Sequence, residues 1–212
     1  MKNKSQIFRL LNYKNLLKQL KALGFKKVFS DNISDTLEIS SSLVRKDFGT
    51  FGITGNRKGG YDIETVLNKI DDILGKDEVQ RVIVVGVGRI GQALMHYNGF
   101  SNEGIEIIAG FDTDSNRIDE KAEIPVYSID KLSDYVHNNK IQIAIMSVPK
   151  LAAKHTVEIL EQCGIGGVLN FTSMKFKSHD EMTINNIDIV NELENLIYQV
   201  NNREEIQDNN QN

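Results

Sequence analysis

The sequence of 212 residues contains a single cysteine, Cys163, and no long uninterrupted run of apolar residues. One cysteine excludes an internal disulfide and a zinc site built on several thiolates. Cys163 stands beside Gly164 in a stretch of helical period, so we expect a small buried apolar residue rather than a reactive thiol. No apolar run reaches the ~20 residues of a membrane helix, and the start, MKNKSQIFRL, lacks the features of a secretory signal. We therefore expect a cytoplasmic protein with no membrane partner.

Positive charge is scarce in most of the chain and concentrated at its start. Residues 1–60 carry twelve Lys or Arg against four Asp or Glu, a net charge of +8. Residues 61–212 carry thirteen against twenty-five, a net charge of −12. A basic N-terminal segment followed by an acidic remainder indicates an N-terminal domain that binds a polyanion and a second domain with another function. Charge alone leaves a solvated basic surface open as the alternative.

The basic N-terminal segment is expected to form three helices followed by a glycine-rich hairpin. Apolar residues recur at helical spacing over 6–23. Ser30 or Asp31 can cap a short second helix, and a tight polar stretch leads into a third over 43–48. Residues 48–62, FGTFGITGNRKGGYD, are rich in glycine and have no helical period. This composition favours a glycine-hinged hairpin, or wing.

The pattern changes to alternating strands and helices after a polar boundary. Asp62 can cap a helix that ends at Gly75, and the segment KDEVQ, 76–80, is the expected domain boundary. Continuous apolar runs then predict strands of a parallel sheet with right-handed crossovers. The expected strands cover 82–85, 105–111, 141–148, 168–171 and 182–188, with helices over 151–163 and 189–200.

A glycine-rich turn follows the first of these strands. The run GVGRIG, 86–91, has the spacing G-x-G-x-x-G and opens a helix, and Asp112 ends the next strand twenty-one residues past Gly91. Gly86 permits the tight turn, Gly88 lets the backbone approach a pyrophosphate, and Gly91 allows close packing of helix and strand. A carboxylate at Asp112 can accept hydrogen bonds from the adenine ribose and would repel a 2′-phosphate, which favours NAD(H) over NADP(H). Arg117 could in principle pair with a 2′-phosphate, so NADP(H) stays open as a minor alternative.

A dehydrogenase is the first alternative for such a sequence. It needs a substrate pocket and a proton donor or acceptor near the nicotinamide. Only 121 residues follow Gly91, and the predicted sheet uses nearly all of them. No Tyr-x-x-x-Lys pair follows the expected strand 141–148, and His96 is expected on a helix surface. We therefore expect a protein that binds the dinucleotide and is not an enzyme.

The chain resembles the Rex family of redox-sensing repressors, which join a winged helix to a Rossmann domain. The resemblance runs from about Arg9 to Val200. It is carried by the blocks VRKDFGTFG (44–52), GNRKGGYD (55–62), GVGRIGQAL (86–94), HYNGF (96–100), FDTD (111–114), VLNF (168–171) and NIDIVNEL (186–193). It implies a homodimer, with each C-terminal helix swapped against the partner's Rossmann domain, that binds double-stranded operator DNA with an inverted repeat and is released by NADH.

The resemblance also implies which residues contact DNA. The family's recognition helix matches residues 41–48, where Asp47 is expected to order its neighbours rather than touch DNA. Gly49 and Thr50 stand where the family usually has a Ser-Tyr pair, so the preferred operator can differ. The residues expected at the DNA, in the major groove, at phosphates or in the minor groove, are Ser41, Ser42, Arg45, Lys46, Phe48, Arg57 and Lys58.

The same resemblance implies a sensor. Tyr97 matches a tyrosine near the nicotinamide, and Asp188 matches an acidic residue that pairs with it or with a basic residue of the first helix. By register that basic position is Asn15, although Lys14 and Lys18 are close. The expected contacts to NADH and NAD⁺ are Gly86, Val87, Gly88, Arg89, Ile90, Gly91, Tyr97, Asp112 and Asp188.

The expected fold class is α/β, with an N-terminal winged helix-turn-helix domain and a Rossmann-type parallel-sheet domain. We predict a DNA-binding domain at 1–78, an NAD(H)-binding domain at 79–188, a dimerisation helix at 189–202 and a disordered tail at 203–212. A pocket lined by apolar groups such as Ile189 would favour the neutral reduced ring over the cationic oxidised ring. The open alternatives are an NAD-dependent oxidoreductase, a winged-helix repressor that senses another nucleotide such as a CoA derivative, and a purely architectural protein.

Overall fold

The computed structural model describes residues 4–56, 59–75 and 79–202. The chain divides into two compact units, Met1–Glu78 and Val79–Asn212. Most of the predicted boundary segment (76–78) and the predicted tail (203–212) lie outside the described residues. Among the described residues no helix is long and apolar enough to cross a membrane.

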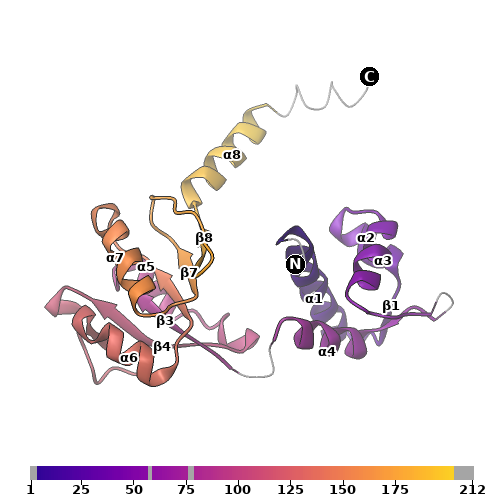
Figure 1. Cartoon of the computed structure of the whole chain (residues 1–212). Helices are drawn as coiled ribbons and strands as arrows, with labels where there is room; N and C mark the ends of the chain where they lie inside the picture. Colours follow the sequence, from indigo (N-terminus) through magenta and orange to yellow (C-terminus); the bar gives the residue numbers. More distant parts are fainter. Residues whose placement is uncertain (1–3, 57–58, 76–78, 203–212) are drawn as a thin grey trace. The chain divides into compact units, whose positions relative to one another are not determined.

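The described residues of the first unit form four helices and a small antiparallel sheet (Figure 1). Its elements are α1 (Lys4–Ala22), β1 (Lys27–Val28), α2 (Ser30–Leu37), α3 (Ser41–Thr50), β2 (Tyr61–Asp62) and α4 (Ile63–Ile73). As expected, Asp62 caps α4, because its carboxylate accepts a hydrogen bond from the Thr65 N–H at 2.9 Å. The hydroxyl of Ser40 does the same for α3 with the Leu43 N–H at 3.2 Å.

The start of α2 differs from the expectation. Ser30 is already helical, and the residue before the helix is Phe29, whose side chain cannot act as a cap. The side chain of Asn32 instead accepts a hydrogen bond from the Phe29 N–H at 3.2 Å. The N-terminus of α2 is therefore capped by a side chain inside the helix, Asn32, and not by a Ser or Asp that precedes it.

The wing is less regular than a two-stranded hairpin. An isolated bridge between Asn56 and Gly60 joins its two arms, and the second arm continues into β2. β2 pairs with β1, with Val28 opposite Tyr61. Arg57 and Lys58, both predicted to contact DNA, lie outside the described residues.

The core of the first unit surrounds Phe48, which has no exposed surface. Its ring makes edge-to-face contacts with Tyr13 and Tyr61, at centroid distances of 5.4 and 4.8 Å. Phe48 follows the buried Val44 by one helical turn, so α3 packs this face inward. A fully buried ring cannot reach a groove of DNA, and we withdraw Phe48 as a DNA-contact residue.

The second unit is a six-stranded sheet of order β5-β4-β3-β6-β7-β8 in which every neighbouring pair is parallel. The strands are β3 (Gln80–Val85), β4 (Ile105–Asp112), β5 (Val126–Ser128), β6 (Ile143–Met146), β7 (Gly167–Asn170) and β8 (Thr183–Asn186). The helices are α5 (Arg89–Met95), α6 (Leu132–Asn139), α7 (Lys150–Gln162) and α8 (Ile189–Asn201). The predicted parallel sheet is confirmed, and β5 and α6 are additions to it.

The two faces of this sheet are covered by different helices. Ile83 and Phe111 pack with Leu132 of α6 and Leu160 of α7 on one face. Met95 of α5 belongs to a separate cluster on the other. From the central β3 the chain builds outward to β4 and β5, then crosses back to β6. The carboxyl ends of β3 and β6 therefore flank the point where the strand order reverses, which is where open α/β sheets bind ligands.

Helix α8, the yellow helix after β8 in Figure 1, buries none of its residues. Its first residue, Ile189, is 59% exposed. The large apolar side chains left exposed on it are Ile189, Val190, Leu193, Leu196, Ile197, Tyr198 and Val200. Such a contiguous apolar surface on a helix needs a partner surface.

Candidate functional site

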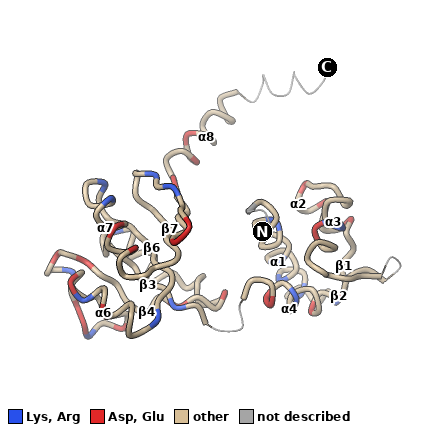
Figure 2. Tube along the Cα trace, in the orientation of Figure 1, with Lys and Arg blue, Asp and Glu red and all other residues tan. Residues whose placement is uncertain are grey.

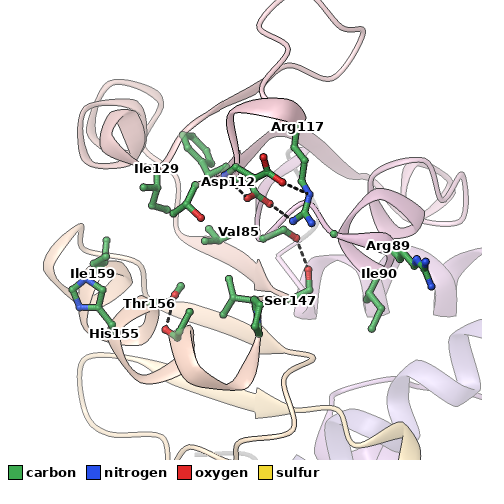
Figure 3. Close-up of a pocket in the computed structure, with 18 residues that line it drawn as sticks. Val85, Arg89, Ile90, Asp112, Arg117, Ile129, Ser147, His155, Thr156 and Ile159 are labelled. Atoms are coloured by element: carbon green, nitrogen blue, oxygen red, sulfur yellow. Dashed lines mark hydrogen bonds and ion pairs between the residues drawn. The ribbon is translucent and has the colours of Figure 1, made fainter.

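A cavity of about 690 Å³ opens at the point of strand reversal in the second unit (Figure 3). Its volume lies within the range of small-molecule and cofactor sites. Four segments line it: the glycine-rich turn after β3, the segment after β4, Ile129 after β5, and α7 with the turn before it. The lining residues are Val85, Gly86, Gly88, Arg89, Ile90, Phe111, Asp112, Thr113, Asp114, Arg117, Ile129, Ser147, Val148, Pro149, Ala152, His155, Thr156 and Ile159.

The glycines of the turn have distinct structural reasons. Gly86 has φ +91°, a conformation that side chains disfavour, and a Cβ there would come within 2.8 Å of the Ser147 main chain. A Cβ on Gly91 would lie 2.1 Å from the Gly86 carbonyl oxygen, so helix α5 can approach the strand only with glycine there. A Cβ on Gly88 would meet, among the described residues beyond its chain neighbours, only Arg117 Nη1, at 3.9 Å, so this position is open to the cavity. Open space at Gly88 is what a bound pyrophosphate requires.

Asp112 ends β4 with a side chain that is only 6% exposed. One carboxylate oxygen accepts hydrogen bonds from the Val87 N–H at 2.7 Å and from Arg117 at 3.2 Å. The other oxygen accepts from the Asp114 N–H at 2.9 Å. An ionised carboxylate has about four acceptor sites, so three are used inside the protein and one remains for a ribose hydroxyl. Asp112 therefore braces the glycine-rich turn as well as lining the cavity.

The charge of Asp112 is favoured by this arrangement. Burial opposes its ionisation, but the hydrogen bonds from the N–H groups of Asp114 and Val87 and from Arg117 outweigh burial and lower the pKa. Val87 itself is buried and absent from the cavity lining. Since its N–H already points to Asp112, Val87 positions the turn and does not offer that N–H to a ligand, which corrects its predicted role. Gly91 is likewise a packing residue outside the lining.

The far wall of the cavity was not predicted from the sequence. Ser147 follows β6, and its hydroxyl donates a hydrogen bond to the Gly86 carbonyl at 2.7 Å. Helix α7 then contributes His155, Thr156 and Ile159 to the lining. The available signal was the end of the predicted strand 141–148, because the carboxyl ends of neighbouring parallel strands meet at one edge.

Helix α3 is fixed to α1 by a buried carboxylate. Asp47, 1% exposed, accepts two hydrogen bonds from Arg9 at 2.6 and 2.8 Å and one from the Tyr13 hydroxyl at 2.9 Å. Burial raises the pKa of Asp47, but the bonds from Arg9 and Tyr13 outweigh it and lower that pKa overall. The expectation that Asp47 orders its neighbours is consistent with these contacts.

Polar and basic side chains occupy the opposite face of α3. Arg45 is half exposed and donates hydrogen bonds to the hydroxyls of Ser30 at 2.8 Å and Ser41 at 3.0 Å. Ser42 and Lys46 are exposed on the same helix, where Figure 2 marks basic positions in blue. The guanidinium of Arg45 is thus oriented at the surface by two hydroxyl groups.

Both units match known families. A family model described as "CoA binding domain" matches residues 77–174. Another, described as "Putative DNA-binding protein N-terminus", matches residues 4–49. The redox-sensing transcriptional repressor Rex of Oenococcus oeni is 37% identical over 204 residues, which cover 93% of this chain and 92% of the relative. Rex of Bacillus pumilus is 36% identical over 192 residues, which cover 90% and 88%.

The chain belongs to the Rex family.

It is accordingly a redox-sensing transcriptional repressor. Solved structures of the Rex-family repressor RSP agree in fold. RSP in complex with β-NAD⁺ and operator DNA has a TM-score of 0.90 and 28% identity, covering 100% of this chain and 97% of that chain. RSP in complex with β-NADH has a TM-score of 0.87 and 28% identity, covering 98% of each. The predicted union of a winged helix-turn-helix with a Rossmann-type sheet is confirmed.

Two residues expected at the cofactor lie outside the cavity of this Rex-family chain. Tyr97 is 60% exposed and packs edge-to-face on Phe100, in a separate recess of about 350 Å³. Asp188 caps α8 by accepting a hydrogen bond from the Asn191 N–H at 3.1 Å, and it pairs with Lys175 at 3.2 Å. Within one chain, neither side chain lines the glycine-rich cavity.

The first helix also differs from the Rex pattern. Asn15 is exposed and uncharged at the position where the family resemblance implies a basic residue. The neighbouring Lys14 is buried and forms an ion pair with Asp71 of α4. Lys14 therefore joins α1 to α4 inside the first unit and is not presented at the surface as a substitute.

Proposed function

We propose that the protein represses transcription as a homodimer that binds an inverted-repeat operator and leaves it when NADH binds. The observation that carries the cofactor half is the cavity at the strand reversal, with open space at Gly88 and the braced carboxylate of Asp112. The family and the two RSP complexes support the coupling of this site to DNA. Because the relatives are named repressors, we propose that the dinucleotide is bound as a signal and not turned over.

The cofactor would be held at both ends of the cavity. Gly88 and the N-terminus of α5 would receive the pyrophosphate, with Arg89 and Ile90 beside it. Asp112 would accept a hydrogen bond from the adenine ribose through its remaining acceptor site. An Asp112→Arg variant that still preferred NADH over NADPH would contradict this assignment.

The DNA contacts are assigned to the exposed face of α3 and to the wing. Arg45 would read base edges, whereas Ser41, Ser42 and Lys46 would contact phosphates or bases beside it. Arg57 and Lys58 of the wing keep their proposed phosphate or minor-groove role. Two such units in a dimer must match half-sites roughly 34 Å apart or a multiple of that spacing. A modest change in their placement would therefore abolish binding.

Helix α8 supplies the link between two chains. We propose that it packs on the second unit of the partner subunit, since its own chain leaves its apolar side chains uncovered. The swapped helix would bring Ile189, and Asp188 at its cap, to the partner's cofactor site. An apolar cover there favours a neutral dihydronicotinamide over a cationic ring, because burying an unpaired charge is costly. A coupling of about 1–3 kcal/mol between cofactor and DNA is typical, and near-complete switching needs about 5.5 kcal/mol.

The deciding experiment is a titration of the operator complex, followed by fluorescence anisotropy. NADH should release the DNA at a far lower concentration than NAD⁺. Indifference to both would contradict the proposal. The match of residues 77–174 to the "CoA binding domain" model gives a reason to include coenzyme A as a third arm. Release by coenzyme A alone would favour the second candidate, a repressor of the same fold that senses another nucleotide.

A further inference from the structure

A short segment between β7 and β8 is held by a pair of asparagines. Asn170, at the carboxyl end of β7, has no exposed surface, and its amide donates hydrogen bonds to the Met174 carbonyl at 2.7 Å and to the Asn186 side chain at 2.9 Å. Its oxygen accepts from the Thr172 N–H at 2.9 Å. The side-chain amide of Asn186 in β8 donates a hydrogen bond to the Phe176 carbonyl at 2.8 Å and accepts one from the Phe176 N–H at 3.1 Å. Residues 172–176 are thus fastened to the last two strands.

The fastened segment presents one charged side chain to the start of α8. Lys175 stands between the two anchored residues Met174 and Phe176, and its Nζ lies 3.2 Å from Asp188 Oδ2. The other carboxylate oxygen of Asp188 caps the helix through the Asn191 N–H at 3.1 Å. The buried Asn170 therefore holds Met174, the next residue Lys175 pairs with Asp188, and Asp188 caps the first turn of α8.

This connection matters because, among the described residues, α8 packs no buried side chain against its own chain. No residue of the helix is buried. The orientation of α8 therefore depends on how Asp188, at its N-terminus, is held. The hydrogen bond from the Asn191 N–H alone would let the Asp188 carboxylate move together with the helix. The ion pair to a segment anchored on the sheet removes that freedom. Lys177, two residues further on, is exposed, and no ion pair links it to Asp188 among the described residues.

We infer that Lys175 is a positioning residue, which is braced by Asn170 and Asn186 and fixes the start of α8 through Asp188, and so sets how well α8 covers the cofactor site of the partner subunit. The inference rests on the proposed function for its effect on the cofactor response. The ion pair itself lies within one unit and can be tested separately. Asn15 carries no charge and Lys14 is engaged by Asp71, so Lys175 is the basic partner that the described structure gives to Asp188.

The test compares three full-length variants, Lys175→Met, Lys175→Arg and the matched control Lys177→Met. The first readout is the NADH concentration that releases half of the operator DNA. Lys175→Met should raise it about two- to five-fold, the range for one exposed ion pair, because a loosened α8 covers the dihydronicotinamide less well. Operator affinity without cofactor should be unchanged in all three. Lys175→Arg should restore the wild-type value, and Lys177→Met should equal it.

The second readout is the titration of the Asp188 carboxyl carbon by NMR, assigned with Asp188→Asn. In Lys175→Met its pKa should rise and still stay below the ordinary value, since the Asn191 N–H continues to bind it. An unchanged titration would overturn the ion pair, and an NADH midpoint equal to that of Lys177→Met would overturn the positioning role. If wild-type protein ignores NADH, the proposed function fails, and the carboxyl titration still decides whether Lys175 holds Asp188.

Discussion

The carboxylate of Asp112 accepts a hydrogen bond from the main-chain N–H of Val87 at 2.7 Å. This bond joins the end of β4 to the turn after β3, so the residue expected to select the ribose also shapes the turn expected to receive the pyrophosphate. Substitution of Asp112 should therefore lower the affinity for the dinucleotide as a whole and not only change the preference between NADH and NADPH.

Asp112→Asn should weaken NADH binding about five- to thirty-fold, which corresponds to about 1–2 kcal/mol for a buried N–H left without an acceptor. An amide has one acceptor oxygen, so it cannot serve both Val87 and Asp114. Isothermal titration calorimetry measures the affinity. The control is Asp134→Asn on the exposed surface of α6, and equal affinities for the two variants would contradict the bracing role.

Alanine at two glycines of the turn should separate binding from stability. Gly88→Ala should leave the free energy of unfolding within about 0.5 kcal/mol, because there is room for a Cβ, yet weaken NADH at least about tenfold by occupying the pyrophosphate position. Gly91→Ala should destabilise the fold by about 1–3 kcal/mol, since its Cβ would collide with the Gly86 carbonyl. Urea unfolding and calorimetry measure both. The assignment fails if Gly88→Ala binds NADH normally.

Asp47→Asn should destabilise the first unit by about 1–3 kcal/mol, because Arg9 and Tyr13 lose an ionised acceptor. The pKa of Asp47 is lowered in the folded state, so its contribution is complete above the unfolded value near ~4 and is lost as the pH falls through the folded value. Denaturant unfolding from pH 7 to about pH 2.5 should accordingly show a shallower pH dependence in the variant than in wild type. Asp35→Asn, at an exposed position of α2, serves as the control and should retain the wild-type slope.

Arg45→Ala should weaken operator binding by about 1–3 kcal/mol and relax the preference at the base that it reads. Lys46→Ala should instead weaken binding to all DNA sequences alike and reduce the slope of log K against log salt concentration by about one. Anisotropy against specific and scrambled duplexes at several salt concentrations distinguishes the two. Lys69→Ala on α4 is the control, and a loss there as large as that for Arg45→Ala would argue against α3 as the reading helix.

Two carboxylates placed on the apolar face of α8, Leu193→Glu with Ile197→Glu, should convert the dimer to monomer. Each would place a charge in a surface that we propose the partner covers. Size-exclusion chromatography with light scattering measures the mass. Glu194→Gln on the same helix should leave the dimer intact, and a double variant that stays dimeric at micromolar concentration would contradict the swapped helix.

Local sequence signals were sufficient for much of the fold. Apolar spacing predicted α1 and α4, the cap Asp62 placed the start of α4, and continuous apolar runs predicted β3 and β4. β5 was missed because its three residues, Val126–Ser128, are too few to show a period. Phe48 could have been recognised as a core residue, since it follows Val44 by four positions on one helix face.

The glycine-rich turn and Asp112 could be predicted from their spacing in the sequence, whereas the contacts between distant segments could not. The glycine-rich turn carries its own spacing, so its role could be inferred from residues 86–91. The bond between Asp112 and Val87 joins residues twenty-five positions apart, and Arg9 meets Asp47 across thirty-eight. Such partners are set by the packing of whole elements and leave no local pattern. The same holds for Lys175, whose segment is held by the buried Asn170 and by Asn186 before it meets Asp188.

The uncovered apolar face of α8 has a genetic consequence. If two chains complete each other through this helix, subunits from two alleles in one cell will mix in the same assembly. A subunit with an intact α8 and a disabled recognition helix, such as Arg45→Ala, would then capture normal subunits in dimers that hold only one half-site. Such an allele would be dominant over the wild type, whereas an allele that loses α8 would be recessive.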